Sequence, residues 1–297
     1  MTAQPAYEKY GGEAHTVYYG DALTVLADCV PDGSVDLVFA DPPYNIGKQF
    51  NGFRDRWPSD EAYAEWCYSW LQLCIAKLRD TGSMYVMCST QGMPYIDIFL
   101  RSRMDILSRI VWRYDSSGVQ AKSRFGSMYE PILHCVRDPR NYTFNGDSVL
   151  VEAHTGARRK LIDYRRTTPA PYNTTKVPGN VWYFPRVRYR MAEYEEHPSQ
   201  KPEALLERII LASSNEGDTV LDPFAGTFTT SAVARRLGRR SIGIERELEY
   251  VKIGLRRLGL ATRLGGEELR PPRKAYVRRN GRPAQAAEAG QRRLMEE

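Results

Sequence analysis

The sequence has few cysteines and histidines, and their spacing forms no cluster. Its five cysteines contain no Cys-x-x-Cys pair, and only 4 histidines accompany them. Neither a zinc site nor a disulfide framework is therefore expected. We predict reduced thiols and no bound metal in a cytoplasmic protein. The cysteines are Cys29, Cys67, Cys74, Cys88 and Cys135.

Membrane segments and phosphate-binding loops are also missing. No apolar run reaches the length of a membrane span, no signal peptide is visible, and the mean hydropathy is -0.51. Gly-Lys-Ser/Thr is absent, and no strand is followed by the three-glycine dinucleotide fingerprint. Acidic residues number 36 against 42 lysines and arginines, so the formal net charge is +6. We expect no membrane partner and a preference for a polyanionic one.

The sequence does contain an apolar strand that ends abruptly in Asp41-Pro42-Pro43-Tyr44. The run from residue 34 to 40 is apolar and partly β-branched, which predicts a buried strand. The strand must stop here because neither proline can donate a hydrogen bond to a sheet. A carboxylate and an aromatic ring then lie at the carboxyl end of a strand, where open α/β sheets bind ligands. An ordinary surface turn is the alternative for these four residues alone.

A second strand and loop lie far downstream, in residues 218–226. Thr229 and Thr230 are expected to cap a following helix, and Gly238 to terminate it. Residues 240–245 predict the next strand, which ends in a glutamate. The result is a βαβ unit with a carboxylate roughly 20 residues after the loop, the spacing at which such a group holds ribose hydroxyls.

The loop of this unit suits a nucleoside that carries no phosphate. Its single glycine, Gly226, cannot form the cradle of a dinucleotide site, and Asp222 would repel a pyrophosphate. A ligand with an amino group and a positive charge fits these carboxylates better, and S-adenosylmethionine is such a ligand. The alternative is an ordinary βαβ unit with capping threonines.

Together the two segments resemble the amino-methylating DNA methyltransferases of the β class, in which the catalytic motif precedes the cofactor motif. The resemblance runs from about Gly20 to about Gly259 and is greatest to the adenine-specific, YhdJ-like group. It implies an α/β, Rossmann-like S-adenosylmethionine-dependent methyltransferase fold that is circularly permuted and carries an inserted target-recognition region. The other matching segments are residues 20–22, 82–87, 110–118, 177–182 and 197–202.

The resemblance implies a role for each motif. Asp41, Pro42, Pro43 and Tyr44 are the catalytic residues. The segment from His197 opens a helix whose free N–H groups, beside a lysine, favour the carboxylate of the cofactor's methionine end. The implied cofactor-binding residues are Asp21, Ala22, Asp41, His197, Ser199, Lys201, Pro202, Asp222, Pro223, Phe224, Ala225, Gly226, Thr227 and Glu245.

The expected reaction is methyl transfer to the exocyclic N6 of an adenine flipped out of double-stranded DNA. Asp41 and the carbonyl of Pro42 would accept the two amino hydrogens, and Tyr44 would stack on the base. No cysteine follows a proline, which argues against methylation of a cytosine ring carbon. Cytosine N4 is the alternative target, although that group usually begins the tetrapeptide with serine. A protein or RNA methyltransferase and a non-enzymatic DNA-binding protein are further alternatives.

Basic and aromatic side chains alternate in residues 137–196, where hydrophobic periodicity fades. This composition suits phosphate and base-edge contacts, and the resemblance implies the target-recognition segment here. A solvated loop with ordinary arginines is the alternative for any one of these residues. The candidate DNA contacts are Asn45, Ser116, Ser117, Arg158, Arg159, Lys160, Arg186, Arg188 and Arg190.

The predicted organisation has five parts. They are a frayed leader (1–14), the catalytic half (15–136), the target-recognition region (137–196), the cofactor-binding half (197–264) and a basic, disordered tail (265–297) that adds sequence-independent affinity for DNA. The aromatic-rich residues 61–71 are expected to pack in the core. A DNA substrate would place the protein in the bacterial cytosol or nucleoid. The recognition sequence and the choice between monomer and homodimer are left open.

Overall fold

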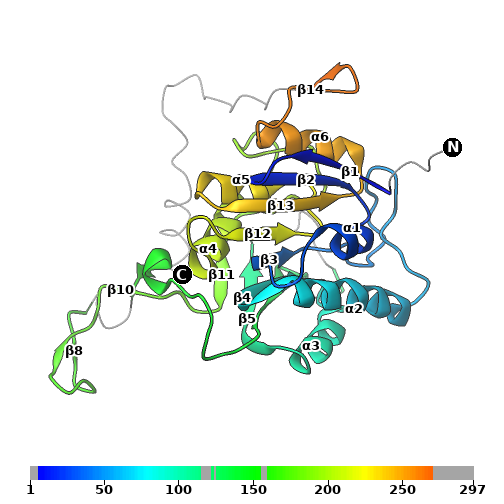
Figure 1. The fold of residues 1–297 in the computed structure, drawn as a ribbon. Coiled ribbons are helices and arrows are strands. Elements are labelled where there is room, and N and C mark those ends of the chain that lie inside the picture. Colours follow the sequence, from blue (N-terminus) through cyan, green and yellow to red (C-terminus); the bar gives the residue numbers. More distant parts are fainter. Residues whose placement is uncertain (1–5, 115–121, 124, 155–158, 270–297) are drawn as a thin grey trace.

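A mixed sheet organises the chain in the computed structural model, which describes residues 6–114, 122–123, 125–154 and 159–269 (Figure 1). Its nine strands follow the order β1-β2-β13-β12-β3-β4-β6-β5-β11. Neighbours from β2 to β4 are parallel, whereas β4, β6 and β5 alternate in direction. The bounds are β1 Tyr7–Gly11, β2 His15–Gly20, β3 Val35–Ala40, β4 Leu78–Met87, β5 Asp105–Arg113, β6 Tyr129–Val136, β11 Val181–Tyr183, β12 Thr219–Asp222 and β13 Arg240–Glu245.

The order of the strands brings the two halves of the chain together. β3 lies between β12 and β4, with Leu37 and Val38 opposite Val220 and Leu221. Parallel strands end at the same edge of a sheet, so the loops after β3 and β12 are neighbours there. This mixed α/β arrangement confirms the predicted Rossmann-like fold.

Helices cover both faces of the sheet and explain the apolar run of β3. Val38 and Ala40 pack in one core cluster with α2, and Leu37 and Phe39 pack in a second cluster with α4 and α5. Because side chains alternate between the faces of a strand, a strand covered on both sides is apolar throughout. The helices are α1 Ala22–Cys29, α2 Asp60–Lys77, α3 Met93–Arg101, α4 Glu203–Ser213, α5 Thr229–Arg236 and α6 Leu248–Arg257.

A buried phenylalanine fixes the loop between β12 and α5. Phe228 is fully buried and has a left-handed backbone, with φ of 57°. Its ring fits against Gly243 on β13 and Gly254 on α6, where a Cβ atom would come within 2.6 Å of the ring or closer. These two glycines let α6 approach β13, which holds the loop in one conformation.

The structure corrects several local expectations. Residues 1–14 were predicted to be a frayed leader, but Tyr7–Gly11 forms the antiparallel edge strand β1. Thr229 and Thr230 do not cap α5: they lie in its first turn, and Phe228 holds the cap position. The predicted tail begins too early, because Leu269 is buried in the third core cluster and its N–H donates to Thr262. Other expectations hold. β13 has the predicted bounds, and all five cysteines are free thiols, four of them buried.

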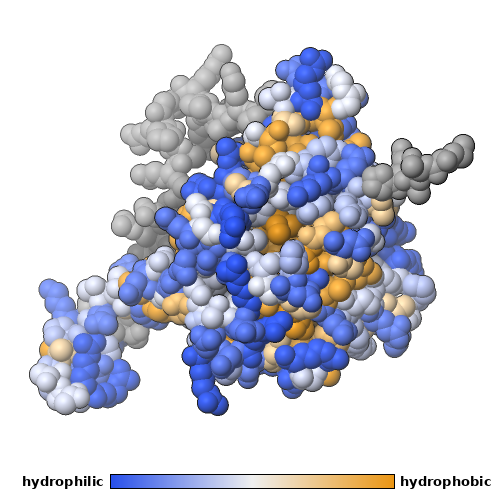
Figure 2. All heavy atoms as spheres, in the orientation of Figure 1, coloured by the Kyte–Doolittle hydropathy of each residue, from blue (hydrophilic) through white to orange (hydrophobic). Residues whose placement is uncertain are grey.

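The region between β6 and α4 contains short elements and one projecting arm. Figure 1 shows the hairpin of β8 and β9 extending from the body of the molecule, and Figure 2 shows that hydrophilic residues dominate its surface. The region is not wholly separate, since β11 pairs with β5 in the main sheet. The short elements are the 3-10 helix Gly146–Val149, β7 Val151–Glu152, β8 Ile162–Asp163, β9 Ala170–Pro171 and β10 Thr175–Lys176, followed after α6 by β14 Arg263–Leu264 and β15 Glu267–Glu268.

The described residues contain neither a membrane-spanning helix nor a cluster of metal-binding side chains. No helix among them is long and apolar enough to cross a membrane. Their histidine, cysteine, aspartate and glutamate side chains also form no group of three or more that could hold a metal ion.

Candidate active site

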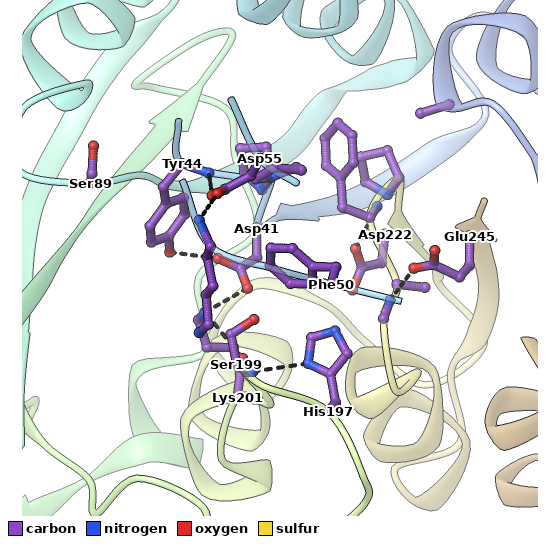
Figure 3. Close-up of a pocket in the computed structure, with 18 of the residues that line it drawn as sticks. Asp41, Tyr44, Phe50, Asp55, Ser89, His197, Ser199, Lys201, Asp222 and Glu245 are labelled. Atoms are coloured by element: carbon purple, nitrogen blue, oxygen red, sulfur yellow. Dashed lines mark hydrogen bonds and ion pairs between the residues drawn. The ribbon is translucent and has the colours of Figure 1, made fainter. Parts of the chain in front are cut away.

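A cavity of about 750 Å³ lies at the carboxyl ends of β3, β12 and β13 (Figure 3). This volume is typical of sites that bind a small molecule or cofactor. The loops after β3 and β12 both line it, as does Glu245 at the end of β13. The two sequence motifs, about 180 residues apart, therefore contribute to one site.

Asp41 is held by two donors of the protein. The hydroxyl of Tyr44 donates to Oδ1 at 2.6 Å, and the ammonium of Lys201 lies 2.6 Å from Oδ2. Glu130, on β6, lies close to both donors: its Oε2 is 3.1 Å from the Tyr44 hydroxyl and 3.4 Å from the Lys201 nitrogen. Two carboxylates, a phenol and an ammonium thus form one network at the end of β3. Figure 3 shows three of its members, Asp41, Tyr44 and Lys201.

Burial and neighbouring charges shift the proton affinities of this network. Burial raises the pKa of Asp41, and Lys201 opposes that rise. Burial alone would lower the pKa of Lys201, but Asp41 and Glu130 raise it above its usual value. Burial and the adjacent carboxylates raise the pKa of Tyr44 well above its ordinary value, so the phenol keeps its proton. Lys201 therefore stays cationic and Tyr44 stays a hydrogen-bond donor.

Two other carboxylates face the opposite part of the cavity. Glu245 accepts hydrogen bonds from the backbone N–H of Gly226 at 2.9 Å and of Glu247 at 2.8 Å. Asp222 accepts from the Thr230 hydroxyl at 2.5 Å and from the N–H of Phe224 at 3.1 Å. These bonds join the loop after β12 to the end of β13, so each carboxylate also shapes the backbone of the site.

Desolvation raises the pKa of both carboxyl groups. Burial raises the pKa of Asp222 to about 7 and that of Glu245 to about 7, although hydrogen bonds to each oppose the rise. Near neutral pH a ligand that donates hydrogen bonds or carries positive charge would favour the ionised forms. Strongly shifted carboxyl groups in a cavity are typical of a functional site.

The segment from His197 to Lys201, which was predicted to bind the cofactor, lines the cavity and makes contacts within the protein. His197 is a neutral imidazole, because burial lowers its pKa to about 3, and its Nδ1 accepts the N–H of Ser199 at 3.1 Å. Lys201, two residues before α4, pairs with Asp41. At that helix end, the N–H of Glu203 already donates to Glu193 at 2.7 Å. One anion-binding group of the predicted site is therefore occupied by the protein itself.

A short hairpin after the tetrapeptide covers part of the cavity. Phe50 and Phe53 stack with ring centroids 5.1 Å apart, and Phe50 lies 5.8 Å from the His197 ring. Asp55, which is 1% exposed, accepts the backbone N–H groups of Tyr44 and of Lys48. The hairpin is thereby attached to the tetrapeptide that begins at Asp41.

An aromatic wall completes the cavity. The Phe224 ring lies 5.6 Å from Trp66 and 5.0 Å from Trp70 on α2. The aromatic stretch was predicted to be core, and Trp70 is indeed fully buried within it. Both tryptophans also line the cavity, which the sequence pattern did not indicate.

The structure sorts the predicted site residues into three groups. Those that line the cavity are Asp21, Ala22, Asp41, Pro42, Pro43, Tyr44, Arg186, His197, Ser199, Lys201, Asp222, Pro223, Phe224, Ala225, Gly226, Thr227 and Glu245. Those that do not are Asn45, Arg159, Lys160, Arg188, Arg190 and Pro202. Ser116, Ser117 and Arg158 lie outside the described residues.

Several predicted residues have an additional structural role. Asp21 caps α1 by accepting the N–H groups of Leu23 and Thr24. Arg186 lies over the Tyr114 ring, 4.8 Å from its centroid, at the rim of the cavity.

Sequence reasoning missed the second carboxylate and the hairpin. Glu130 stands near the start of an antiparallel strand, so the rule that ligands lie at the carboxyl ends of strands does not find it. Lys48, Phe50 and Asp55 lie in a hairpin without a recognisable motif. A search for unpaired acidic residues in apolar strands would have singled out Glu130.

Comparison with known proteins identifies relatives across the chain. The sequence profile of the DNA methylase family, which covers N6 and N4 methyltransferases, matches residues 35–256. The DNA adenine methyltransferase YhdJ of Escherichia coli (strain K12) is 60% identical over 266 residues, which cover 90% of this chain and 90% of that protein. The type II methyltransferase M.HpaI of Haemophilus parainfluenzae is 35% identical over 229 residues, covering 76% of this chain and 69% of that protein.

Solved structures share the fold at low sequence identity. The complex of M1.HpyAVI with SAM has a TM-score of 0.56 and 24% identity, covering 82% of this chain and 99% of that one. The cytosine-N4-specific PvuII DNA methyltransferase has a TM-score of 0.60 and 19% identity, covering 86% of this chain and 92% of that one.

Proposed function

The chain belongs to the DNA methylase family, and we propose that it transfers a methyl group from S-adenosylmethionine to the exocyclic N6 of adenine in DNA. The observation that carries this proposal is the shared cavity, where Asp41 lies at the end of β3 and Glu245 at the end of the β13 strand. One end presents a carboxylate to an amine, and the other presents carboxylates to a nucleoside. The 60% identity to a DNA adenine methyltransferase supports adenine as the target.

The cofactor supplies a methyl group that is already activated by the positive charge on sulfur. Among the residues of this chain, Glu245 would hold the ribose hydroxyls, while Phe224 and the tryptophans of α2 would enclose the flat adenine ring of the cofactor. The absence of a phosphate cradle and the 750 Å³ volume fit a nucleoside of this size. His197, which is neutral and nearby, adds no repulsion toward a sulfonium.

At the other end, Asp41 and the carbonyl of Pro42 accept the two hydrogens of the target amine. These bonds orient the nitrogen lone pair toward the methyl group, so the rate comes from alignment and electrostatics. The amine becomes acidic only after the methyl group has moved, and the proton can then pass to a carboxylate of the network. The Tyr44 ring would stack on the base, which offsets part of the cost of extruding it from the duplex.

We further propose that the protein acts on double-stranded DNA at a specific sequence, in the cytosol or nucleoid. The net charge of +6 favours a polyanion, and the arm of β8 and β9, which projects from the body of the molecule (Figure 1), would supply additional contacts to it. Of the described arginines that line the cavity, which also include Arg54, Arg56 and Arg246, only Arg186 lies in the predicted target-recognition region, and it would contact the strand that carries the target base.

The test is direct chemical analysis of methylated DNA. Purified protein, DNA and S-adenosylmethionine are incubated, the DNA is digested to nucleosides, and the methylated nucleosides are identified by mass spectrometry. We expect N6-methyladenine, in a single sequence context when DNA from expressing cells is mapped. N4-methylcytosine instead would support the alternative base, and no methylated base with the wild type would refute the proposal.

A further inference from the structure

The network around Asp41 poses a chemical problem for substrate binding. The target amine needs an acceptor, yet both oxygens of Asp41 are already engaged, Oδ1 by the Tyr44 hydroxyl and Oδ2 by the Lys201 ammonium. Glu130 lies within reach of both donors, 3.1 Å from the hydroxyl and 3.4 Å from the ammonium. It is therefore an alternative partner for each donor when Asp41 turns an oxygen to the base.

We propose that Lys201 reads the target base, its ammonium donating to adenine N1 while Asp41 accepts from N6. Glu130 is the positioning residue that keeps the lysine charge compensated in this state. The inference rests on the proposed function, and it assigns Lys201 to the base instead of to the methionine end of the cofactor.

The donors and acceptors of Asp41 and Lys201 match those of the adenine edge. An ionised carboxylate only accepts hydrogen bonds and an ammonium only donates them. Asp41 Oδ2 and Lys201 Nζ lie side by side, 2.6 Å apart, so they can engage two neighbouring atoms of one base edge. The Watson–Crick edge of adenine presents an N6 amino donor beside the N1 acceptor, and a flipped base is read along that edge.

The same pattern explains which bases the site would reject. Guanine and thymine place a carbonyl acceptor where adenine has its amino group, and a ring N–H where adenine has N1. The carboxylate would then face an acceptor and the ammonium a donor, which leaves buried polar groups unpaired at high cost. Cytosine presents the adenine pattern through N4 and N3, so this pair selects amino-bearing bases and not adenine alone.

Burial makes this reading effective. The Lys201 side chain is 8% exposed and that of Glu130 is 15% exposed, so little water competes for them. If the buried Lys201 ammonium moved away from Asp41 and no other anion were nearby, its charge would be strongly destabilising. Glu130 removes that cost, since Lys201 moves between acceptors that are both already close.

The test is a cycle that combines an atom change in the base with a side-chain change in the protein. Duplexes carry adenine, 1-deazaadenine or 7-deazaadenine at the target position, each opposite an abasic site so that the analogues do not differ in base pairing. 1-Deazaadenine lacks N1, and 7-deazaadenine is the matched control, altered on the other edge. The measured quantity is kcat/KM for DNA at saturating S-adenosylmethionine.

We expect the wild type to lose roughly 10- to 100-fold on 1-deazaadenine, the range for a hydrogen bond to a charged group, and little on 7-deazaadenine. Lys201→Met should be slow on all three and should no longer distinguish them. Lys201→Gln, which keeps an N–H donor on a side chain one atom shorter, should retain part of the discrimination. Glu130→Gln disturbs the same network but keeps the ammonium, so it should be slower than the wild type and still discriminate.

Several results would overturn the inference. They are equal wild-type rates on the two deaza bases, an unchanged 1-deaza penalty in Lys201→Met, and loss of discrimination in Glu130→Gln as complete as in Lys201→Met. If Lys201→Met does not fold, equal wild-type rates on the two deaza bases would still refute the inference, and Lys201→Gln would test the contribution of the lysine. A wild type that fails to methylate natural adenine would refute the proposed function itself, which separates the two failures.

Discussion

The affinity for S-adenosylmethionine should fall as the pH is lowered through about 7, because Glu245 must be ionised to accept ribose hydroxyls. Burial raises the pKa of this group to about 7 in the cofactor-free protein. If only the ionised form binds, the apparent dissociation constant grows by the factor 1 + 10^(pKa − pH). That factor is about 1.1 at pH 8 and about 11 at pH 6, so the affinity should drop roughly tenfold across this interval.

Glu245→Gln tests the assignment. The variant should bind about 1.5–3 kcal/mol more weakly at pH 8, the range for hydrogen bonds to a charged group, and should lose the tenfold dependence that Glu245 contributes. Asp222 also has a pKa raised to about 7, so Asp222→Asn is the matched control that measures its separate share. Titration calorimetry between pH 6 and 8, in buffers of different ionisation enthalpy, gives both the affinity and the protons released.

Thermal unfolding supplies an independent check of the sign. A carboxyl group whose pKa is higher in the folded than in the unfolded protein stabilises the fold at low pH, and that stability is lost as the pH rises through the folded value. The cofactor-free protein should therefore gain stability from Glu245 as the pH falls below about 7. The rise in Tm caused by the cofactor should shrink over the same interval. Wild-type affinity that is constant from pH 8 to 6, or that changes identically in Glu245→Gln, would refute the reasoning.

Three further outcomes are expected. Asp41→Ala should lower kcat by roughly 10²–10³ with little change in cofactor affinity, measured by single-turnover kinetics and calorimetry, and near wild-type turnover would contradict its role. Arg257→Gln should lower the free energy of unfolding by about 1–3 kcal/mol, because the guanidinium donates to the Thr227 carbonyl at 2.9 Å and to Glu203 at 2.7 Å. Urea titration measures this change, and an unchanged midpoint would contradict the structural role of Arg257. Removal of residues 270–297 should weaken binding to all DNA sequences and reduce the salt dependence while the methylated sequence stays the same, and methylation mapping would reveal any change of site.

The parts of the site that lie on parallel strands could be predicted from the sequence. A strand covered on both faces is a continuous apolar run, and prolines or a glycine mark its end, so Asp41 and Asp222 were identified with their strands. Glu245 followed from its spacing after the loop. In each case the chemistry lies at the carboxyl end of the element that the pattern reveals.

The remaining parts depend on contacts between distant segments. β1 is an edge strand, and its alternation of apolar and polar residues is too weak to predict a strand. It is formed by pairing with β2. Glu130 enters the site because β6 runs antiparallel to β4, a direction that no local pattern encodes. Lys201 was predicted to bind the carboxylate of the cofactor together with the N-terminus of α4. Its ion pairs with Asp41 and Glu130 could not be predicted, because those carboxylates lie on or directly after strands that are distant in the sequence.

One segment connects the predicted target-recognition region with the residues around Asp41. The region between β6 and α4 returns to the sheet through β11, and from there the chain runs past Arg186 at the cavity rim to Lys201 beside Asp41. Glu195, which pairs with Arg256 of α6 at 2.5 Å, ties this run to the cofactor half. Only about 15 residues separate the rim arginine from the base-reading lysine, and the ion pair restricts their movement. The segment is therefore held at three places: at Arg186 by the Tyr114 ring, at Glu195 by the ion pair with α6, and at Lys201 by Asp41.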